Sequence, residues 1–300
     1  MRILHTSDWH IGKRLMGRER LDEQSAALDE IVGICEREEV ELVLVAGDIF
    51  DTYLPSAEAE DLFFSKIKTM AGEDRAVLLI SGNHDDGVRL SAAAPLSEEL
   101  GIYIVGNARK PLPINVRRRV RPVRSGAGFA VFENDRGEKA FVNALPYPNE
   151  ARFKEEKSDL SFAERIKKWI DEGEAENPER LPSVFLSHIF VVGGVTSESE
   201  REIDLGGARA VPLDVLPKSD YIALGHLHKR QHMGKGHCYY SGSPLQYSFD
   251  EANGEKGVKV FDLTAKGVEN LRDVALKSGR RLVRLEAESP AQAEELLFLY

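Results

Sequence analysis

The chain has 300 residues, with 40 lysines and arginines against 50 aspartates and glutamates, so its formal net charge is −10. This acidic balance excludes nucleic-acid binding by overall positive charge, and an anionic substrate would have to be held by local groups or metal ions. The two cysteines, Cys35 and Cys238, are far apart, which argues against a disulfide framework or a cysteine-based zinc site and favours a cytoplasmic protein. Neither a signal peptide nor an apolar run of the roughly 18–20 residues that span a membrane is expected.

The first half of the chain alternates predicted strands and helices. Apolar residues at helical spacing predict helices over 20–38, 57–70 and 88–100. Short apolar runs predict buried strands over 3–4, 42–46, 77–80 and 102–105. This order predicts a largely parallel sheet with helices on its faces.

The second half has a different pattern. Short alternating stretches and a turn signal at 134–137 predict antiparallel strands over 112–146. An exposed helix is expected near 162–170, and a new unit is expected from Arg281, with a strand over 282–285 and a helix from about Pro290. Further strands are predicted over 184–186, 221–224, 236–241, 257–263 and 268–274.

Polar clusters follow several of the predicted buried strands. Loops beyond the carboxyl ends of strands in an open α/β sheet converge on one crevice, so these clusters are expected to meet although they span 220 positions. The clusters are Asp8-Trp9-His10, Gly47-Asp48-Ile49-Phe50-Asp51, Gly82-Asn83-His84-Asp85, His188 and Gly225-His226-Leu227-His228.

The chemistry of these clusters indicates a metal site. Aspartate, asparagine and histidine without cysteine suit Mn²⁺, Fe²⁺ or Zn²⁺. A spacing of two, as in Asp8-x-His10 and His226-x-His228, puts both side chains on one side of an extended backbone. Asp48 is the best-placed carboxylate to bridge two cations, which together would clamp a phosphate and activate water.

Each motif has an ordinary explanation when it is taken alone. An isolated D-x-H is usually a surface loop, and Gly-Asp is common in turns. The motifs occur together, each at the end of a strand, and this combination favours a functional site. Among the remaining histidines, His5 is expected in the core or behind the ligands, and His232 and His237 on the surface.

Taken together, these motifs resemble those of the calcineurin-like metallophosphoesterases. The segments RILHTSDWHIGK, GDIFDTYLPS, GNHDD and SGSPLQYSFDE are similar to those of the SbcD-type nuclease subunits, and the similarity covers nearly the whole chain. It implies an α/β (α+β) sandwich of two β-sheets flanked by helices. It also implies a nuclease domain over 1–279 and the beginning of a small α+β capping domain over 280–300.

The resemblance also implies a mechanism. Two Mn²⁺ ions would hydrolyse DNA phosphodiesters, with 3′→5′ double-strand exonuclease and endonuclease character, in a homodimer that works with an SbcC-type coiled-coil ATPase. His84 would not bind metal but would protonate the leaving 3′ oxygen or stabilise the phosphate, and Asp85 would orient it. One metal would be held by Asp8, His10, Asp48 and His228, and the other by Asp48, Asn83, His188 and His226.

Two basic clusters are candidates for DNA contact. Lys13, Arg14 and Arg18 follow the first metal loop, and positive side chains beside a phosphate path would give salt-sensitive binding. The second cluster, over 117–124, has a competing explanation as a solvated strand edge. Related proteins usually continue into helices that grip the ATPase coiled coil, whereas this chain ends in a predicted helix, so an unfinished capping domain is expected.

Two alternatives remain open at this point. Phosphomonoesterases and protein phosphatases of the same fold typically follow the second motif with Arg-Gly, but here Thr52-Tyr53 follow Asp51. A non-catalytic scaffold that only docks an ATPase would be supported by a degenerate metal site, but every expected ligand type is present.

Overall fold

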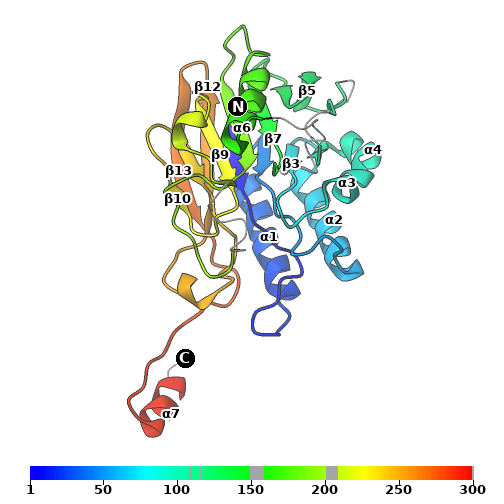
Figure 1. Ribbon diagram of the computed structural model, residues 1–300. Coiled ribbons are helices and arrows are strands. Elements are labelled where there is room, and N and C mark those ends of the chain that lie inside the picture. Colours follow the sequence, from blue (N-terminus) through cyan, green and yellow to red (C-terminus); the bar gives the residue numbers. More distant parts are fainter. Residues whose placement is uncertain (108–109, 115–116, 149–158, 201–208, 299–300) are drawn as a thin grey trace.

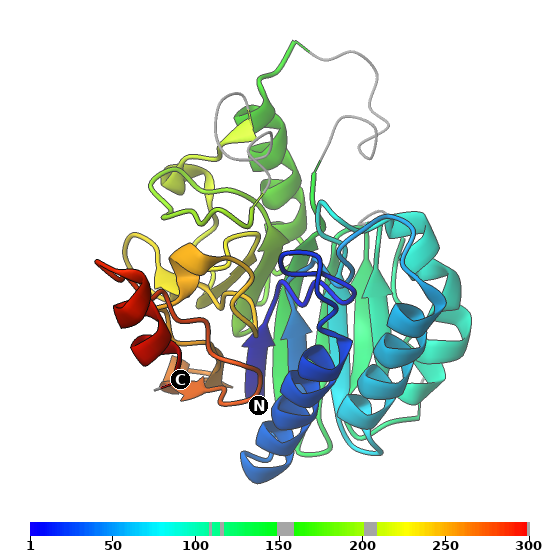
Figure 2. The same cartoon turned by 90° about the horizontal axis from the view of Figure 1, so that it is seen from below.

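The computed structural model describes the chain except for residues 108–109, 115–116, 149–158, 201–208 and 299–300. Two β-sheets pack face to face, and helices cover their outer faces (Figures 1 and 2). The predicted fold class, an α/β sandwich of two sheets flanked by helices, is therefore confirmed.

Among the described residues, the first sheet has six strands in the order β13-β12-β1-β2-β3-β4. β1 to β4 run parallel, as the alternation of strands and helices predicted, whereas β12 and β13 add an antiparallel edge. The bounds are β1 Arg2–Thr6, β2 Leu42–Val45, β3 Ala76–Ile80, β4 Ile102–Val105, β12 Gly257–Thr264 and β13 Gly267–Ala275.

The described part of the second sheet has seven strands in the order β10-β11-β9-β8-β7-β6-β5. β5, β6 and β7 form an antiparallel meander, and the predicted turn joins β6 to β7, with the backbone amide of Gly137 donating to the carbonyl of Asn134. β7, β8 and β9 run parallel, which sends the carboxyl ends of β8 and β9 to one edge. The bounds are β5 Arg121–Gly126, β6 Phe129–Glu133, β7 Lys139–Leu145, β8 Ser183–His188, β9 Tyr221–Gly225, β10 Gln231–His232 and β11 Cys238–Tyr240.

Helices cover both outer faces of the sandwich. α1 (Leu21–Arg37) and α2 (Ala57–Ala71) pack on the first sheet, and α6 (Phe162–Glu174) packs on the second (Figure 2). α6 extends four residues beyond its predicted end, and it is amphipathic rather than wholly exposed, because Ile166 and Ile170 are buried against the sheet.

Strand β2 shows how the core is divided between layers. Leu42 and Leu44 join the apolar cluster between the two sheets, whereas Val43 and Val45 join the cluster beneath α1 and α2. Successive side chains of a strand point to opposite faces, so an uninterrupted apolar run is what a strand buried on both faces needs.

The predicted helix over 88–100 is wrong as a single element. The segment forms α3 (Gly87–Leu90) and α4 (Ala94–Ser97), with short 3₁₀ turns after each. Pro95 lacks the amide hydrogen that a continuous helix would donate to the carbonyl of Ser91, and the α-helix is interrupted over 91–93, in the turn before the proline.

The predicted strand over 282–285 is also wrong. Residues 280–288 have no strand, and the backbone amide of Leu282 donates to Oε1 of Gln246 at 2.7 Å instead of to a neighbouring strand. α7 (Pro290–Phe298) begins where a helix was expected and stands away from the sheets in Figure 1. The division into domains 1–279 and 280–300 stays a prediction.

Candidate metal centre

The structure brings all seven predicted ligand residues to one place. They lie at the edge of the sandwich where the carboxyl ends of strands from both sheets meet. Each is at most 3% exposed. The backbone amide of His226, after β9, donates to Oδ1 of Asp8, after β1, at 3.0 Å, so the two sheets are joined at this point. The seven are Asp8 and His10 after β1, Asp48 after β2, Asn83 after β3, His188 at the end of β8, and His226 and His228 after β9.

One half of the centre is formed by Asp8, His10 and His228. Their ligand atoms lie within 4.8 Å of one another. Nε2 of His10 lies 3.0 Å from Nε2 of His228, so the two imidazoles point at a shared location. This is a set of one oxygen and two nitrogen donors that could hold a metal ion.

The other half is formed by Asn83, His188 and His226. Oδ1 of Asn83 lies 2.8 Å from Nε2 of His188 and 3.0 Å from Nδ1 of His226. The two histidines come from neighbouring strands of the second sheet, and Asn83 comes from the first. The two sheets therefore both contribute to this half.

Asp48 lies between the two halves. Its Oδ2 is 3.4 Å from Nε2 of His10 and 3.4 Å from Nε2 of His188. A single carboxylate oxygen thus faces one imidazole from each half, which is the placement that a bridging ligand requires.

The protonation of His188 shows that these residues fit a cation. Its Nδ1 lies 2.7 Å from the carbonyl oxygen of Ala46, and a carbonyl can only accept, so Nδ1 carries a hydrogen. In the neutral ring Nε2 is then a lone pair that faces the oxygens of Asn83 and Asp48. Acceptors that converge in this way repel one another unless a positive charge lies among them.

The ionisation of the buried groups follows the same electrostatics. Burial raises the pKa of Asp48, but the imidazoles of His188, His84 and His10 lower it more and hold it well below its usual value. Burial lowers the pKa of His188, but the Asp48 carboxylate raises it more, to about 9. Burial lowers the pKa of His10 to about 3 and raises that of Asp8 to about 6. The His188 imidazolium thus places beside Asp48 a positive charge that a metal ion can replace.

The backbone of the centre is held in an unusual conformation. Asp8, His10, Asp48 and His226 all have positive φ angles, of 54°, 45°, 51° and 111°. Such angles are uncommon outside glycine and cost about 1–3 kcal/mol each. Strained backbone of this kind is typical of functional sites, where the surrounding structure enforces it.

Glycines let the strand ends approach one another. A Cβ atom on Gly82 would lie 2.0 Å from Oδ1 of Asp48, and one on Gly225 would lie 1.9 Å from the carbonyl oxygen of Ala46. Any side chain at either position would push the ligand loops apart.

His84 lies beside the centre and contacts the backbone of Asp51. Nδ1 of His84 lies 2.7 Å from the carbonyl oxygen of Asp51, and the His84 and His10 rings are 4.6 Å apart, edge to face. The ligand atoms of His84, His10 and Asp48 lie within 4.8 Å of one another, so the non-ligating role of His84 stays a prediction.

Asp85 is engaged with the backbone of the ligand loops. Its carboxylate accepts hydrogen bonds from the backbone amides of Ile49, Phe50 and Gly82, at 3.1, 3.0 and 2.8 Å. Burial, with a contribution from Asp48, raises its pKa to about 6. These contacts brace the β2 and β3 loops against each other.

The orienting role predicted for Asp85 stays a prediction. Asp51, which the second motif contained but to which no role was assigned, accepts from the His84 ring through its carbonyl. Its carboxylate also lies 3.2 Å from Nδ1 of His10. Asp51 is therefore a residue of the site that sequence reasoning missed, although its place in the Gly47–Asp51 cluster was a signal for it.

Comparison with known proteins places this centre in a family. Residues 1–230 match the family model described as calcineurin-like phosphoesterase. The D subunit of the nuclease SbcCD of Bacillus subtilis (strain 168) is 39% identical over 96% of this chain and 72% of that protein. The corresponding D subunit of Rhodobacter capsulatus is 35% identical over 99% of this chain and 74% of that protein.

The chain belongs to the calcineurin-like phosphoesterase family. The predicted resemblance to SbcD-type subunits is confirmed by these relatives, and so is the assignment as a nuclease-type hydrolase.

Two solved structures show the same fold at low identity. TT1561 of Thermus thermophilus is 12% identical, with a TM-score of 0.51 over 91% of this chain and 98% of that one. GAP50, the anchor in the inner membrane complex of Plasmodium, is 13% identical, with a TM-score of 0.53 over 94% of this chain and 87% of that one. These likenesses support the phosphoesterase fold alone, because one fold can carry unrelated functions.

The remaining histidines of the phosphoesterase lie where they were expected. His5 is fully buried, and its Nδ1 lies 3.1 Å from the hydroxyl of Tyr221. His232 and His237 are exposed. No helix in the described ranges is both long and apolar enough to cross a bilayer.

The three predicted DNA contacts lie in the loop between β1 and α1. Nζ of Lys13 pairs with Asp51 at 3.0 Å, beside the centre, and Arg14 pairs with Glu19 at 3.4 Å. Arg14 and Arg18 are exposed, whereas Lys13 is partly buried. Arg14 and Arg18 are therefore the more accessible charges of this cluster.

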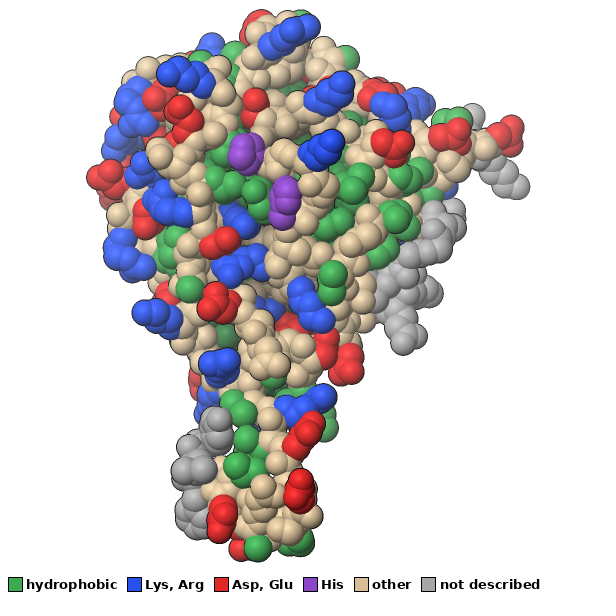
Figure 3. All heavy atoms as spheres, turned by 90° about the vertical axis from the view of Figure 1, so that its left-hand side faces the viewer, with side chains coloured by type: hydrophobic (Ala, Val, Ile, Leu, Met, Phe, Trp, Pro, Cys, Tyr) green, Lys and Arg blue, Asp and Glu red, His purple; other side chains and the backbone are tan. Residues whose placement is uncertain are grey.

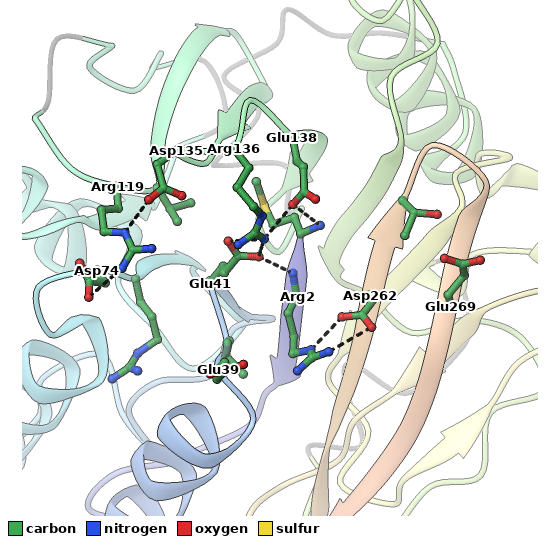
Figure 4. A pocket seen from close by; sticks show the side chains of 15 residues that line it. Arg2, Glu39, Glu41, Asp74, Arg119, Asp135, Arg136, Glu138, Asp262 and Glu269 are labelled. Atoms are coloured by element: carbon green, nitrogen blue, oxygen red, sulfur yellow. Dashed lines mark hydrogen bonds and ion pairs between the residues drawn. The ribbon is translucent and has the colours of Figure 1, made fainter.

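A charged pocket of about 560 Å³ lies at the opposite end of β1, beside Arg2. In Figure 4 its side chains turn toward one another: Arg136 pairs with Glu41 and Glu138, and Arg119 pairs with two aspartates. None of the predicted ligands lines this pocket. Arg119, from the second basic cluster, is thus engaged in ion pairs at the end of β1 remote from the metal centre.

Proposed function

We propose that this chain is the DNA nuclease subunit of an SbcC–SbcD-type complex, with two Mn²⁺ ions in its site. It would hydrolyse DNA phosphodiesters as a 3′→5′ double-strand exonuclease and as an endonuclease, in DNA end processing, repair and recombination. The position of Asp48 Oδ2, 3.4 Å from an imidazole nitrogen of each half, carries the two-metal part of this proposal.

The donor set supports the choice of metal class. Carboxylate, amide and imidazole groups without thiolate suit Mn²⁺, Fe²⁺ or Zn²⁺. Both cysteines are buried and free, Cys35 on the inner face of α1 and Cys238 on the α6 side of the second sheet. Neither is among the seven predicted ligands, and two free thiols agree with the cytoplasmic setting that we expect from the sequence.

Bound divalent cations would supply Lewis-acid polarisation of the phosphate and activation of water. Asp8, His10, Asp48 and His228 would hold one, and Asp48, Asn83, His188 and His226 the other. Because Nδ1 of His84 donates to the carbonyl of Asp51, its Nε2 is the nitrogen that would exchange a proton with the leaving 3′ oxygen.

The partners in the proposal are DNA, an SbcC-type ATPase and a second copy of this chain. Large apolar side chains on α2 and over the 88–100 segment are exposed and are candidates for a contact with a partner protein. The exposed fractions are 44% for Phe64, 82% for Val88, 80% for Leu96 and 41% for Leu100. Light scattering of the purified chain should give twice the monomer mass if the homodimer forms through the chain alone.

One assay with two substrates tests the proposed reaction. Purified protein with Mn²⁺ is given linear duplex DNA in one reaction and p-nitrophenyl phosphate in another. The nuclease proposal expects DNA cleavage that a chelator abolishes. Rapid turnover of p-nitrophenyl phosphate with intact DNA would instead favour a phosphomonoesterase.

A pair of matched variants separates the site from the rest of the chain. Asp48→Asn should abolish cleavage and weaken the binding of both ions, because the amide that replaces the carboxylate is uncharged. Asp61→Asn, at an exposed position on α2, should cleave DNA at the wild-type rate. Two tightly bound ions in Asp48→Asn would contradict the bridging role.

A further inference from the structure

A partly buried series of hydrogen bonds leads away from the metal centre at His228. Nδ1 of His228 lies 2.5 Å from Oγ of Ser199, and that hydroxyl lies 2.5 Å from Oε1 of Glu251. Glu251 is only 2% exposed. Neither Ser199 nor Glu251 belongs to a motif that pointed to metal binding.

The donors around Glu251 define the charge of its carboxylate and the direction of these hydrogen bonds. Its carboxylate also accepts from Nζ of Lys256 at 2.5 Å, and the hydroxyls of Ser248 and Ser197 lie 2.8 and 3.3 Å from its Oε1. A carboxylate surrounded by donors is ionised, so the one hydroxyl hydrogen of Ser199 points to Glu251. The Ser199 oxygen can then only accept, and the hydrogen between it and His228 belongs to Nδ1.

This arrangement leaves the other ring nitrogen of His228 for the metal. With Nδ1 protonated, Nε2 carries the lone pair, and Nε2 is the atom that lies 3.0 Å from Nε2 of His10 in the centre. Metal-binding histidines generally have their second nitrogen fixed by a carboxylate, a carbonyl or a similar acceptor, and this orients the ring.

The same segments also hold the backbone of His228. Its amide donates to Oε1 of Glu200 at 2.7 Å, and its carbonyl accepts from Nζ of Lys256 at 2.8 Å. The 199–200 and 251–256 segments therefore hold both the ring and the backbone of His228 in place. His188 differs, because its Nδ1 is fixed by the backbone carbonyl of Ala46.

We propose that Glu251 and Ser199 are positioning residues that fix the tautomer and orientation of His228 for metal binding. The proposal rests on the metal centre described under the proposed function. Loss of either residue should weaken metal binding in the half of the centre that contains His228. Metal binding in the half that contains His188 should stay unchanged.

The first test uses metal-free protein, so it does not depend on activity. Long-range ¹H–¹⁵N NMR spectra at neutral pH report which ring nitrogen of each histidine is protonated. Wild type should show His228 protonated at Nδ1. Ser199→Ala should lose this preference, and Ser199→Thr, which keeps the hydroxyl, should restore it. An unchanged His228 tautomer in Ser199→Ala would overturn the proposal.

The second test measures Mn²⁺ binding by calorimetry. One of the two sites should weaken by about 10- to 100-fold in Ser199→Ala and Glu251→Gln, while the other changes by less than about twofold. Glu255→Gln, at a residue whose side chain is 82% exposed, removes the same charge nearby and should bind both ions as wild type does. Equal weakening of both sites, or of neither, would contradict the proposal.

Two other outcomes can be distinguished from failure of this proposal: unfolding of Glu251→Gln, and the absence of Mn²⁺ binding by the wild-type protein. Glu251→Gln leaves Lys256 buried without its anion and could unfold the protein, in which case Ser199→Ala, which keeps that pair, decides the question. A wild-type protein that binds no Mn²⁺ would overturn the proposed function, while the NMR comparison would still decide whether Ser199 orients His228.

Discussion

His84 and Asp85 are adjacent in the sequence but contact different parts of the site. His84 places its ring beside His10 and its Nδ1 on the carbonyl of Asp51, whereas Asp85 accepts from three backbone amides of the ligand loops. Asp51, three residues after the bridging candidate, thus joins the candidate general acid to the loop that carries Asp48.

His84→Ala should keep both metal ions and lose most cleavage. If its Nε2 gives a proton to the leaving oxygen, removal of the ring should lower kcat by about 100-fold or more. Calorimetry with Mn²⁺ measures the binding, and a duplex cleavage assay measures the rate. A variant that has lost one ion would identify His84 as a ligand, which the geometry of His10, Asp48 and His84 also allows.

Gly82→Ala should destroy metal binding while most of the fold survives. The added Cβ would lie 2.0 Å from Oδ1 of Asp48 and 2.3 Å from its backbone nitrogen, so the β2 and β3 loops would have to separate. Gly33→Ala provides the control, because in α1 the added Cβ meets only the flexible end of Arg37 at 3.1 Å and alanine favours a helix. Circular dichroism and Mn²⁺ titration of the two variants check this, and wild-type binding by Gly82→Ala would contradict it.

At the scale of elements, the loop between β1 and α1 joins the metal centre to the predicted DNA contacts. Its first part lies against the site through the Lys13–Asp51 ion pair, and its tip exposes Arg14 and Arg18. A phosphate backbone that reaches the centre would pass this loop. The loop is thus the element in which the proposed DNA binding can be separated from catalysis.

The double variant Arg14→Gln/Arg18→Gln should bind DNA more weakly and with a flatter dependence on salt. Each lost phosphate contact reduces the slope of log affinity against log salt by about 0.9. Fluorescence anisotropy with a duplex at several salt concentrations measures the slope. Arg119→Gln/Arg136→Gln removes the same charge at the far pocket and should leave the slope unchanged. Equal slopes for wild type and the first variant would exclude contact by these arginines.

At the scale of the whole molecule, the two sheets are joined by buried polar groups as well as by apolar packing. His5 of β1 reaches Tyr221 of β9 at 3.1 Å, across the interface between the sheets. On the face in Figure 3, basic side chains are interspersed with acidic and apolar ones, and the chain as a whole has a net charge of −10. DNA binding would therefore depend on the centre and its loop rather than on the overall field.

His5 should make the fold less stable in acid. Burial lowers its pKa to about 3, whereas the unfolded chain has a pKa near 6.5, so between these values the unfolded state binds the extra proton. Stability should therefore fall as the pH drops below about 6.5. Urea unfolding of metal-free protein at pH 7 and pH 5 should show wild type losing about 1–2 kcal/mol more than His5→Gln. Equal losses would mean that His5 does not titrate in this way.

Much of the site could be predicted because it follows from local rules. Parallel strands end at one edge of a sheet, so polar residues after successive buried runs had to lie together, and all seven predicted ligand residues do. The helix over 88–100 and the strand over 282–285 failed for opposite reasons: a proline interrupts the first, and the second has no partner strand.

The sequence by itself determined the fold class, the family and the residues that converge on the centre, since these depend on short patterns and strand order. Only the tertiary structure decided which atoms face which. It placed Asp48 Oδ2 between the two halves, set the Asp51 carbonyl against His84, and brought Ser199 and Glu251 behind His228. These contacts join loops that are distant in the chain, and their distances depend on how the two sheets pack, which no local pattern encodes.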